Sequence, residues 1–318
     1  MANAIASRLG QVNATGDDRA LFLKVFGGEV LSAFNRTSAF RQRHMVRVIA
    51  SGKSAQFPVT GLITGGYHTP GTEITGQTVK ANERIITIGD LLLASAFIAN
   101  IDEAMNHYDV RGIYSDEIGD FLGRQYDQNV ARTGILNARS AAIVDGLQGG
   151  SQLTDAAMAT DGTKLWQAIF NSGVLLDQKD IPMADRSTFI RPVQYALVVQ
   201  SEKPINRDIN VNQDNGSIAM GNVNRINNIE LVKTNNLVFS DDRTNQAVPV
   251  DQRGDFSTTQ FLTQHRNAVG TVQLQDVTME SDYDIRRQGT LMLGKYLVGH
   301  GKLRPESGVE GRTAAPAA

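Results

Sequence analysis

The chain contains no cysteine, and this absence excludes disulfide bonds, thiolate metal sites and a cysteine nucleophile. A long apolar run is also absent: the longest candidate, residues 91–101, is shorter than the roughly 20 residues of a membrane-spanning helix and contains Ser95 and Asn100. The first ten residues lack the basic start and apolar centre of a signal peptide. We therefore expect a soluble protein made without export and without a membrane partner, and the lack of cysteine fits a reducing cytoplasm.

An excess of charge of either sign is missing as well. The 31 basic side chains are balanced by 33 acidic ones, which gives a net charge of −2. A protein that binds nucleic acid mainly through its phosphates is usually strongly basic, so this composition leaves room only for a local basic patch. Because 41% of the 318 residues are hydrophobic, the chain can bury a substantial core, and its length suggests about two domains.

No catalytic or metal-binding motif is complete. The string Gly52-Lys53-Ser54 ends like a phosphate-binding loop, but Arg47 stands where its first glycine is required. Residues 210–214 are spaced like a calcium loop, but Asn215 replaces the necessary glycine. The histidines show no metal-ligand spacing; they are His44, His68, His107, His265 and His300. We expect no enzyme, no catalytic residue, no cofactor and no bound metal.

Two long segments cannot bury their own apolar faces. Strand-like residues at 57–59 and 83–88 flank a glycine-rich tip and predict a long hairpin over 51–93. An isolated hairpin is marginally stable in water and needs a neighbour. Helical spacing over 110–144 predicts a helix of roughly 50 Å, interrupted by glycines that indicate either close packing or a helix that must bend; they are Gly112, Gly119, Gly123 and Gly134. Such a chain is suited to packing against copies of itself.

The other segments predict shorter elements. Helical spacing favours helices over 163–179, 193–200 and 286–298, and β-rich patterns favour strands over 188–190, 256–262 and 269–279. Residues 1–18 and the tail after Pro305 are small and polar, so we expect both to be disordered.

A stretch without any acidic residue runs from residue 30 to residue 72. It carries five basic side chains, which are Arg36, Arg41, Arg43, Arg47 and Lys53. One interpretation is a basic arm that meets acidic partners. The other is a solvated face with ordinary ion pairs, each contributing about 0 to 1 kcal/mol.

Several local strings are distinctive: ALFLKVFGGEVL at 20–31, RHMVR at 43–47, SGKSAQFP at 51–58, DEAMNHYDVR at 102–111, RNAVGTV at 266–272 and GHGKLRPE at 299–306. Together they resemble the major capsid proteins of T-seven-like podoviruses, and the string at 102–111 is the most specific. Residues 137–261 resemble that family weakly, through only NGS at 215–217 and IELV at 229–232.

The resemblance implies an α+β fold of the Hong Kong 97 type. Its parts would be an N-terminal arm at 1–50, an extended hairpin (the E-loop) at 51–93, a peripheral (P) domain with a spine helix at 94–145, an axial (A) domain at 146–262, return strands and a helix of the P-domain at 263–305, and a flexible tail at 306–318.

The same resemblance implies a function. Pentamers and hexamers would form an icosahedral shell around double-stranded DNA, without sequence-specific binding, in a virion assembled in the host bacterial cytoplasm. A scaffolding protein and a portal at one vertex would be partners, and the five basic residues would face another subunit, the scaffold or the DNA. An encapsulin-like compartment of the same fold is the alternative. A soluble enzyme or binding module would need a converging polar site, which the sequence does not reveal.

Overall fold

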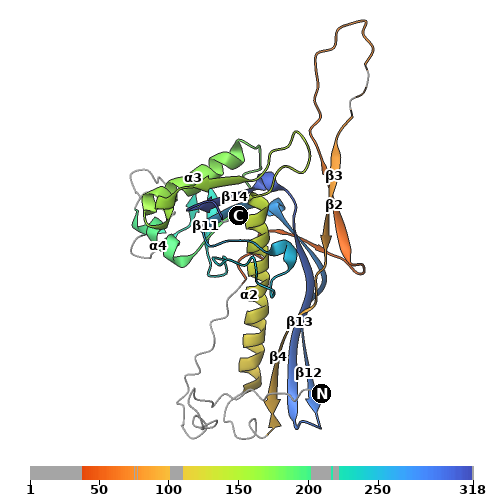
Figure 1. The fold of residues 1–318 in the computed structure, drawn as a ribbon, viewed down its shortest axis with the longest axis vertical. Helices are drawn as coiled ribbons and strands as arrows, with labels where there is room; N and C mark the ends of the chain where they lie inside the picture. The colour runs from red at the N-terminus through yellow and green to blue at the C-terminus, as the bar shows by residue number, and fades with distance from the viewer. Residues whose placement is uncertain are drawn as a thin grey trace. The chain divides into compact units, whose positions relative to one another are not determined.

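The computed structural model describes residues 38–74, 76, 78–100, 110–201, 216–217 and 222–316. It contains both helices and strands (Figure 1), as predicted for an α+β chain. The described residues divide into two compact units: unit 1 comprises those at 38, 89–126 and 274–298, and unit 2 comprises those at 39–88, 127–273 and 299–316. The predicted boundaries at 50, 93, 145 and 262 concern the parts of a capsid subunit and stay predictions. Most of the predicted arm, residues 1–37, lies outside the described residues.

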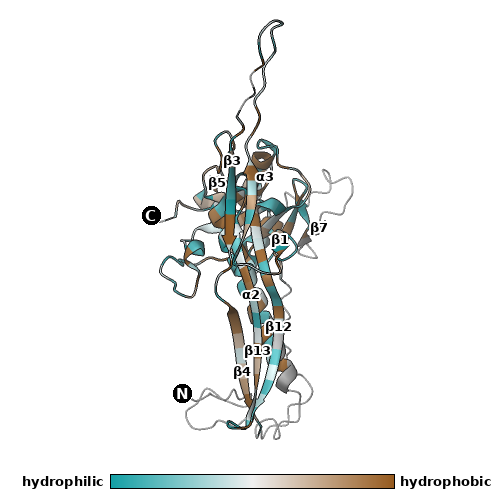
Figure 2. Ribbon diagram, turned by 90° about the vertical axis from the view of Figure 1, so that its right-hand side faces the viewer, coloured by the Kyte–Doolittle hydropathy of each residue, from teal (hydrophilic) through white to brown (hydrophobic). Residues whose placement is uncertain are grey.

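In unit 1, strand β4 (Leu92–Ala99) pairs antiparallel with β13 (Gly289–Lys302), from Leu92 opposite Tyr296 to Ala99 opposite Gly289. Figure 2 shows β4 as the apolar strand of this pair. The predicted helix over 286–298 is therefore wrong. Glycines 289 and 294 weaken a helix, whereas β4 supplies hydrogen-bond partners for an extended chain.

The long helix is confirmed as α2 (Val110–Ala138), which at 29 residues is about 43 Å long. It ends before residue 144 because Gly150 packs directly on Ala138, where an added Cβ would overlap the Ala138 carbonyl. Its glycines differ: a Cβ on Gly134 would lie 2.8 Å from Leu262 Cδ2, whereas one on Gly119 or Gly123 would meet nothing within 4 Å. Close packing therefore explains the glycine at position 134 but not those at positions 119 and 123.

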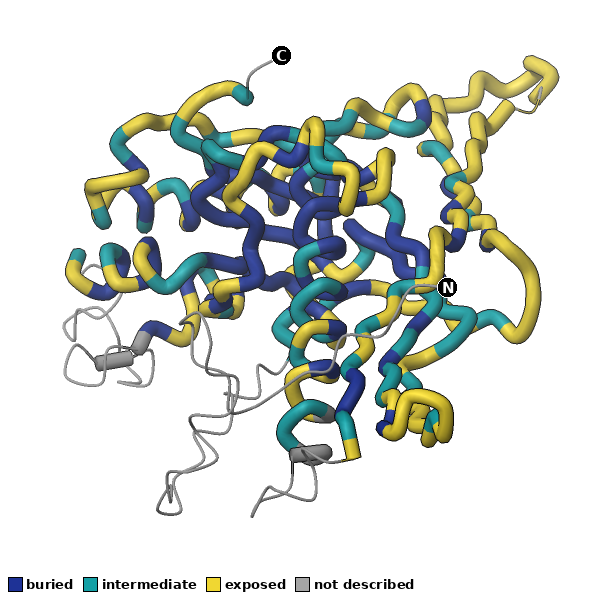
Figure 3. The backbone as a smooth tube through the Cα atoms, turned by 60° about the horizontal axis from the view of Figure 1, so that its bottom comes forward, coloured by how far each residue is buried: buried dark blue, intermediate teal, exposed yellow. Residues whose placement is uncertain are grey.

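Unit 2 is built on a six-stranded sheet in the order β5-β14-β11-β6-β10-β9. Its central strands, β11 (Thr259–His265) and β6 (Arg186–Ile190), are buried at every residue, and Figure 3 shows this buried centre. The remaining strands are β5 (Ser151–Thr154), β10 (Ile229–Lys233), β9 (Arg225–Ile226) and β14 (Gly308–Arg312). The predicted strands at 188–190 and 256–262 are confirmed, with the second beginning at Thr259.

Two helices pack against this sheet through a buried apolar cluster. Helix α3 (Gly162–Asp177) begins after Asp161, whose carboxylate accepts a hydrogen bond from Thr163 N at 2.8 Å, and α4 (Pro192–Gln200) begins at a proline. Both confirm the predicted helices. The cluster includes Leu165, Ile169, Ile190, Val198 and Phe261.

Two further strands, β1 (Met45–Val48) and β12 (Val269–Asp284), pair with each other. Strand β1 pairs in parallel with the start of β12, from Met45 opposite Gly270 to Val48 opposite Gln273. This confirms the strand predicted over 269–279. A short pair, β7 (Gly216–Ser217) with β8 (Asn222–Val223), and 3-10 turns at 156–159, 250–252, 266–268 and 305–307 complete the described elements.

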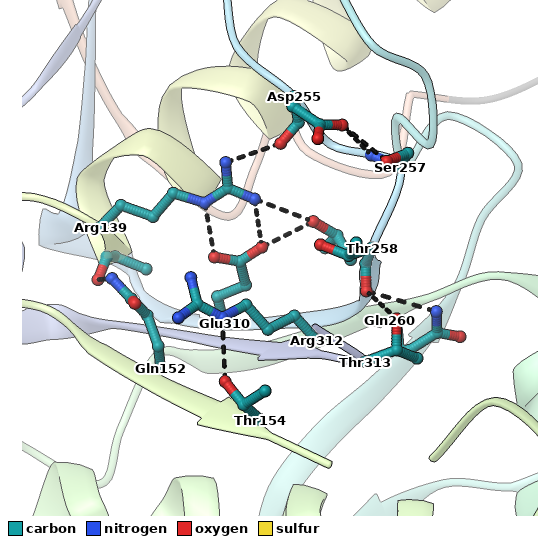
Figure 4. Close-up of polar contacts among 12 residues, drawn as sticks. Arg139, Gln152, Thr154, Asp255, Ser257, Thr258, Gln260, Glu310, Arg312 and Thr313 are labelled. Atoms are coloured by element: carbon teal, nitrogen blue, oxygen red, sulfur yellow. Dashed lines mark hydrogen bonds and ion pairs between the residues drawn. The ribbon is translucent and has the colours of Figure 1, made fainter. Parts of the chain in front are cut away.

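The C-terminal tail is not flexible over residues 306–312. Strand β14 pairs with both β11 and β5, and the side chain of Glu310 is fully buried. Arg139 donates to both Glu310 oxygens at 2.7 and 2.6 Å, and Thr259 Oγ1 donates to Oε1 at 2.6 Å (Figure 4). We expected this tail to be disordered. Its residue Glu310 instead forms an internal ion pair with Arg139, which lies 171 residues away in the sequence.

A chain of buried polar side chains joins His44, just before β1, to β12 and β13 inside unit 2. His44 lies 2.7 Å from the Phe40 carbonyl through Nδ1, and the Thr271 hydroxyl lies 2.8 Å from both His44 Nε2 and His300 Nδ1. Burial lowers the pKa of His44 to about 4 and that of His300 to about 3. Both imidazoles are therefore neutral in the folded chain near pH 7.

Replacing Glu310 by glutamine is expected to lower the free energy of unfolding by roughly 3–5 kcal/mol, because it leaves the Arg139 guanidinium, whose side chain is 13% exposed, without its fully buried counter-ion. The control is Asp284→Asn, which breaks a half-exposed pair with Arg287 and is expected to change stability by at most about 1 kcal/mol. Urea unfolding of the unassembled chain measures both. Equal effects of the two variants would contradict the assigned role of Glu310.

The buried histidines predict acid sensitivity. Unfolded histidine binds a proton below about pH 6.5, whereas His44 and His300 bind one only near their lowered pKa values. The free energy of unfolding should therefore fall as the pH drops below about 6.5, by up to about 1.4 kcal/mol per pH unit for each histidine. His300→Gln should make this dependence shallower, and His68→Gln, on an exposed loop, should not; identical slopes would refute the assignment.

Candidate functional site

The predicted hairpin is present as an antiparallel pair of β2 (Ser54–Thr60) and β3 (Ala81–Thr87). The pairing runs from Ser54 opposite Thr87 to Thr60 opposite Ala81. One face of each strand is covered, by burial of Ala55, Val59 and Ile86, as the period of two requires. The loop between the strands is the long excursion labelled at β2 and β3 in Figure 1.

The end of the β2–β3 ladder next to the tip loop is held by residues 143–145 of the same unit. Lys80 Nζ lies 2.6 Å from Asp145 Oδ2, and Asn82 Nδ2 donates to the Ile143 carbonyl at 3.0 Å. The hydrogen bond from Lys80 lowers the pKa of Asp145. Gly61 fits closely here, because a Cβ would lie 3.1 Å from Val144 Cγ1. The hairpin is therefore fixed at the point where the tip loop leaves the two strands.

The described part of the hairpin tip exposes large apolar side chains. Four large apolar side chains on it are at least 70% exposed: Leu62, Ile63, Tyr67 and Ile74. Glycines 65, 66 and 76 have nothing within 4 Å of an added Cβ. Burying such a side chain contributes about 1.5–3 kcal/mol. A tip of this kind is suited to being covered by another chain.

The sequence-predicted basic residues do not share one environment. Arg43 donates to the Glu230 carboxylate through Nε at 3.0 Å and Nη2 at 2.6 Å, and through Nη1 to the Ala39 carbonyl at 2.9 Å. This hydrogen bond is the main cause that lowers the pKa of Glu230. The charge of Arg43 is thus matched within its own chain, as the second interpretation of the acid-free stretch supposes.

Two others lie at the base of the hairpin. The guanidinium of Arg47 lies 5.5 Å from the centre of the Phe57 ring and donates to the Gln56 carbonyl at 3.0 Å. Lys53 is exposed, and its backbone carbonyl accepts from Ile88 N at 2.8 Å. Arg41 is an exposed residue of the turn before β1, and Arg36 lies outside the described residues.

Sequence reasoning missed a cleft of about 300 Å³ in unit 2. Its walls come from residues 42–43, 183–187, 225–230 and 266. Four arginines and two carboxylates line it: Arg43, Arg186, Arg225, Arg266, Asp185 and Glu230. Because these segments are far apart in the chain, no local motif could have revealed the cleft. The one partial signal was the family-like string at 266–272.

Other sites have no counterpart in the part of the chain that the structure describes. Over those residues, no group of three or more His, Cys, Asp or Glu side chains is placed to hold a metal ion. None of the described helices is both long and apolar enough to cross a membrane.

Comparison with known proteins places these features in a family. The model of the Gp10A-like family, described as a major capsid protein, matches residues 56–311. The major capsid protein of Escherichia phage T7 is 34% identical, with 93% of this chain and 92% of that protein aligned. The major capsid protein of Enterobacteria phage T3 is also 34% identical, with 95% and 94% aligned.

Solved structures agree with this result. The capsid of cyanophage P-SCSP1u superimposes with a TM-score of 0.83 and 39% identity, covering 98% of this chain and 99% of that one. The mature capsid of bacteriophage PhiM1 has a TM-score of 0.77 at 18% identity, covering 98% and 97%, which shows the shared fold. The α+β capsid fold is confirmed, and nothing favours the encapsulin-like alternative. The chain therefore belongs to the Gp10A-like family of phage major capsid proteins.

Proposed function

We propose that this major capsid protein forms pentamers and hexamers that close into an icosahedral shell around double-stranded DNA. The family match over residues 56–311 carries the proposal. The hairpin supports it, because Asp145 and Ile143 fix the end of the strands next to the tip loop, while the apolar tip side chains stay exposed within their own chain. A neighbouring subunit would cover the tip.

The partners follow from the same proposal. The protein is a component of the virion, assembled in the host cytoplasm on a scaffolding protein, with a portal at one vertex. The net charge of −2 supports DNA that is enclosed rather than bound by sequence, because phosphate binding favours a strongly basic protein. As a structural subunit the chain needs no catalytic residue, cofactor or metal.

The basic residues Arg41, Arg47 and Lys53 remain candidates for contact with a neighbouring subunit, the scaffold or the DNA. Arg43 is also a candidate, although its guanidinium binds Glu230 within its own chain. A contact of Arg43 with another chain would have to share or replace that ion pair.

Electron microscopy of the recombinant chain, co-expressed with its scaffolding protein, tests the shell and the hairpin together. Closed icosahedral particles are expected from the wild type. The double variant Ile63→Ser/Tyr67→Ser should give few particles, because it removes apolar contact area at the tip, while the polar control Thr69→Ser/Glu73→Gln should assemble normally. A small wild-type oligomer without particles would refute the shell, and normal assembly of Ile63→Ser/Tyr67→Ser would refute the role of the tip.

Charge reversal separates internal from external roles of the basic residues. Arg41→Glu/Arg43→Glu is expected to reduce particle yield several-fold, while the free energy of unfolding changes by no more than about 1 kcal/mol because both sites are at the surface. Adding Glu230→Arg restores the internal ion pair but not a contact with another chain, so yield should stay low. Normal yield from the double variant, or full recovery on adding Glu230→Arg, would contradict the external role.

A further inference from the structure

We propose that Arg191 of unit 2 binds a carboxylate side chain of a second copy of this chain. The inference rests on the proposed function only in that copies of the chain meet in a shell. The site itself rests on the surroundings of Arg191, which lies between the end of β6 and the start of α4.

The guanidinium of Arg191 is held in place but is not paired. Its central carbon lies 3.7 Å from the centre of the Phe239 ring. Its Nε atom is buried without a hydrogen-bond partner, and the guanidinium forms no ion pair or hydrogen bond with any residue that the structure describes. Burial lowers the pKa of Arg191, as expected for a half-buried cation without a carboxylate beside it.

This arrangement is unfavourable within a single chain. The N–H donors of a guanidinium lie in its plane and need acceptors there, which an aromatic ring below the plane does not supply. Other arginines of unit 2 with buried side chains have such an acceptor. Arg132 binds Asp242 at 2.8 Å, and Arg186 binds Asp177 at 2.7 Å. Arg191 lacks the carboxylate that these arginines have, so its charge serves a contact that the single chain does not make.

The surroundings of Arg191 favour a protein carboxylate over a nucleic acid. Phe239 is 44% exposed, and Val193, two residues beyond Arg191, is 70% exposed. An arginine accompanied by exposed apolar side chains is typical of the residues that dominate protein–protein binding, whereas nucleic acid is bound by many cations together. The first turn of α4 has no side-chain cap, so its backbone N–H groups also favour an anion near Arg191.

A second copy of the chain can supply the carboxylate. The chain has 33 acidic side chains and 31 basic ones, so carboxylates are in excess. Several are exposed and form no ion pair within the described structure; they include Asp90, Asp116, Glu117 and Asp180. An unmatched arginine and unmatched carboxylates on the same chain are complementary when copies pack together. Because a guanidinium binds a carboxylate through two hydrogen bonds, the contact also fixes the orientation of the two copies.

Stability and assembly of two variants test the proposal. Arg191→Leu removes the charge and keeps an apolar side chain beside Phe239. The unassembled variant should unfold at the wild-type temperature or above it, because it loses an unpaired half-buried charge. Its particle yield with the scaffolding protein should fall about tenfold or more. Arg191→Lys should also lower the yield, because an ammonium group does not bind a carboxylate in the same bidentate way.

The matched control is Arg286→Leu, at an exposed arginine of unit 1, which should change neither the unfolding temperature nor the yield. Normal particle yield from both Arg191→Leu and Arg191→Lys would overturn the proposal. A lower unfolding temperature of unassembled Arg191→Leu would overturn it as well, because the arginine would then serve its own fold.

Photo-cross-linking identifies the partner independently of these variants. With p-benzoylphenylalanine in place of Val193, irradiation of the assembled protein should give a covalent band of twice the mass of the chain, joined at a peptide that contains an aspartate or a glutamate. A cross-link to the scaffolding protein alone would refute the second copy. The two proposals fail separately: a wild type that forms only a small oligomer refutes the shell, while the cross-link within that oligomer still decides whether a second copy covers the site.

Discussion

Three charged side chains at the end of α2 or directly after it lie in unit 2, and the arrangement of that unit depends on matching each of them. Asp127 and Arg132 are buried, and the side chain of Arg139 is 13% exposed. Asp127 accepts from Ala39 N at 2.8 Å and from Asn236 Nδ2 at 2.9 Å. Arg132 binds Asp242 at 2.8 Å, and Arg139 binds Glu310. An unmatched buried charge costs several kcal/mol, so a shift of the helix by one residue would be penalised three times. The ion pairs therefore fix the register of α2 against the loop at 236–242 and against β14.

The hairpin and the cleft are positioned from this same centre. Asp127 also accepts from Phe40 N at 3.4 Å, and the Phe40 ring stacks on Phe189 at 3.8 Å between ring centres. The turn that follows carries Arg43 to Glu230 and so forms one wall of the cleft. At the other end, the chain leaves α2 at Ala138 and, within one short loop, residues 143–145 reach the hairpin where its tip loop begins. Rigid internal pairing is thus what sets the direction of two surface features.

The spacing of apolar residues along the sequence predicted the helices and strands whose periodicity lies within one segment. Alternating apolar residues gave β2 and β3, and helical spacing gave α2 and α3, because these periods survive in any environment. It failed where a distant partner decides the outcome. Residues 289–302 became a strand because β4 pairs with it, and Glu310 is internal because of Arg139. The cleft requires four separated segments, so only the fold could reveal it. The family resemblance, rather than any periodicity, supplied the function.

The hairpin tip and the cleft are two different kinds of surface feature. The hairpin tip offers apolar area with little charge, and the cleft is lined mainly by arginines and carboxylates. Neither is large, which keeps the single chain from associating indiscriminately. A closed lattice repeats each contact in every subunit, so weak contacts act together and a detached subunit rebinds at high local concentration. A shell held in this way requires no disulfide bond and no strong net charge. The absence of cysteine and the near-neutral composition are therefore what such an assembly allows.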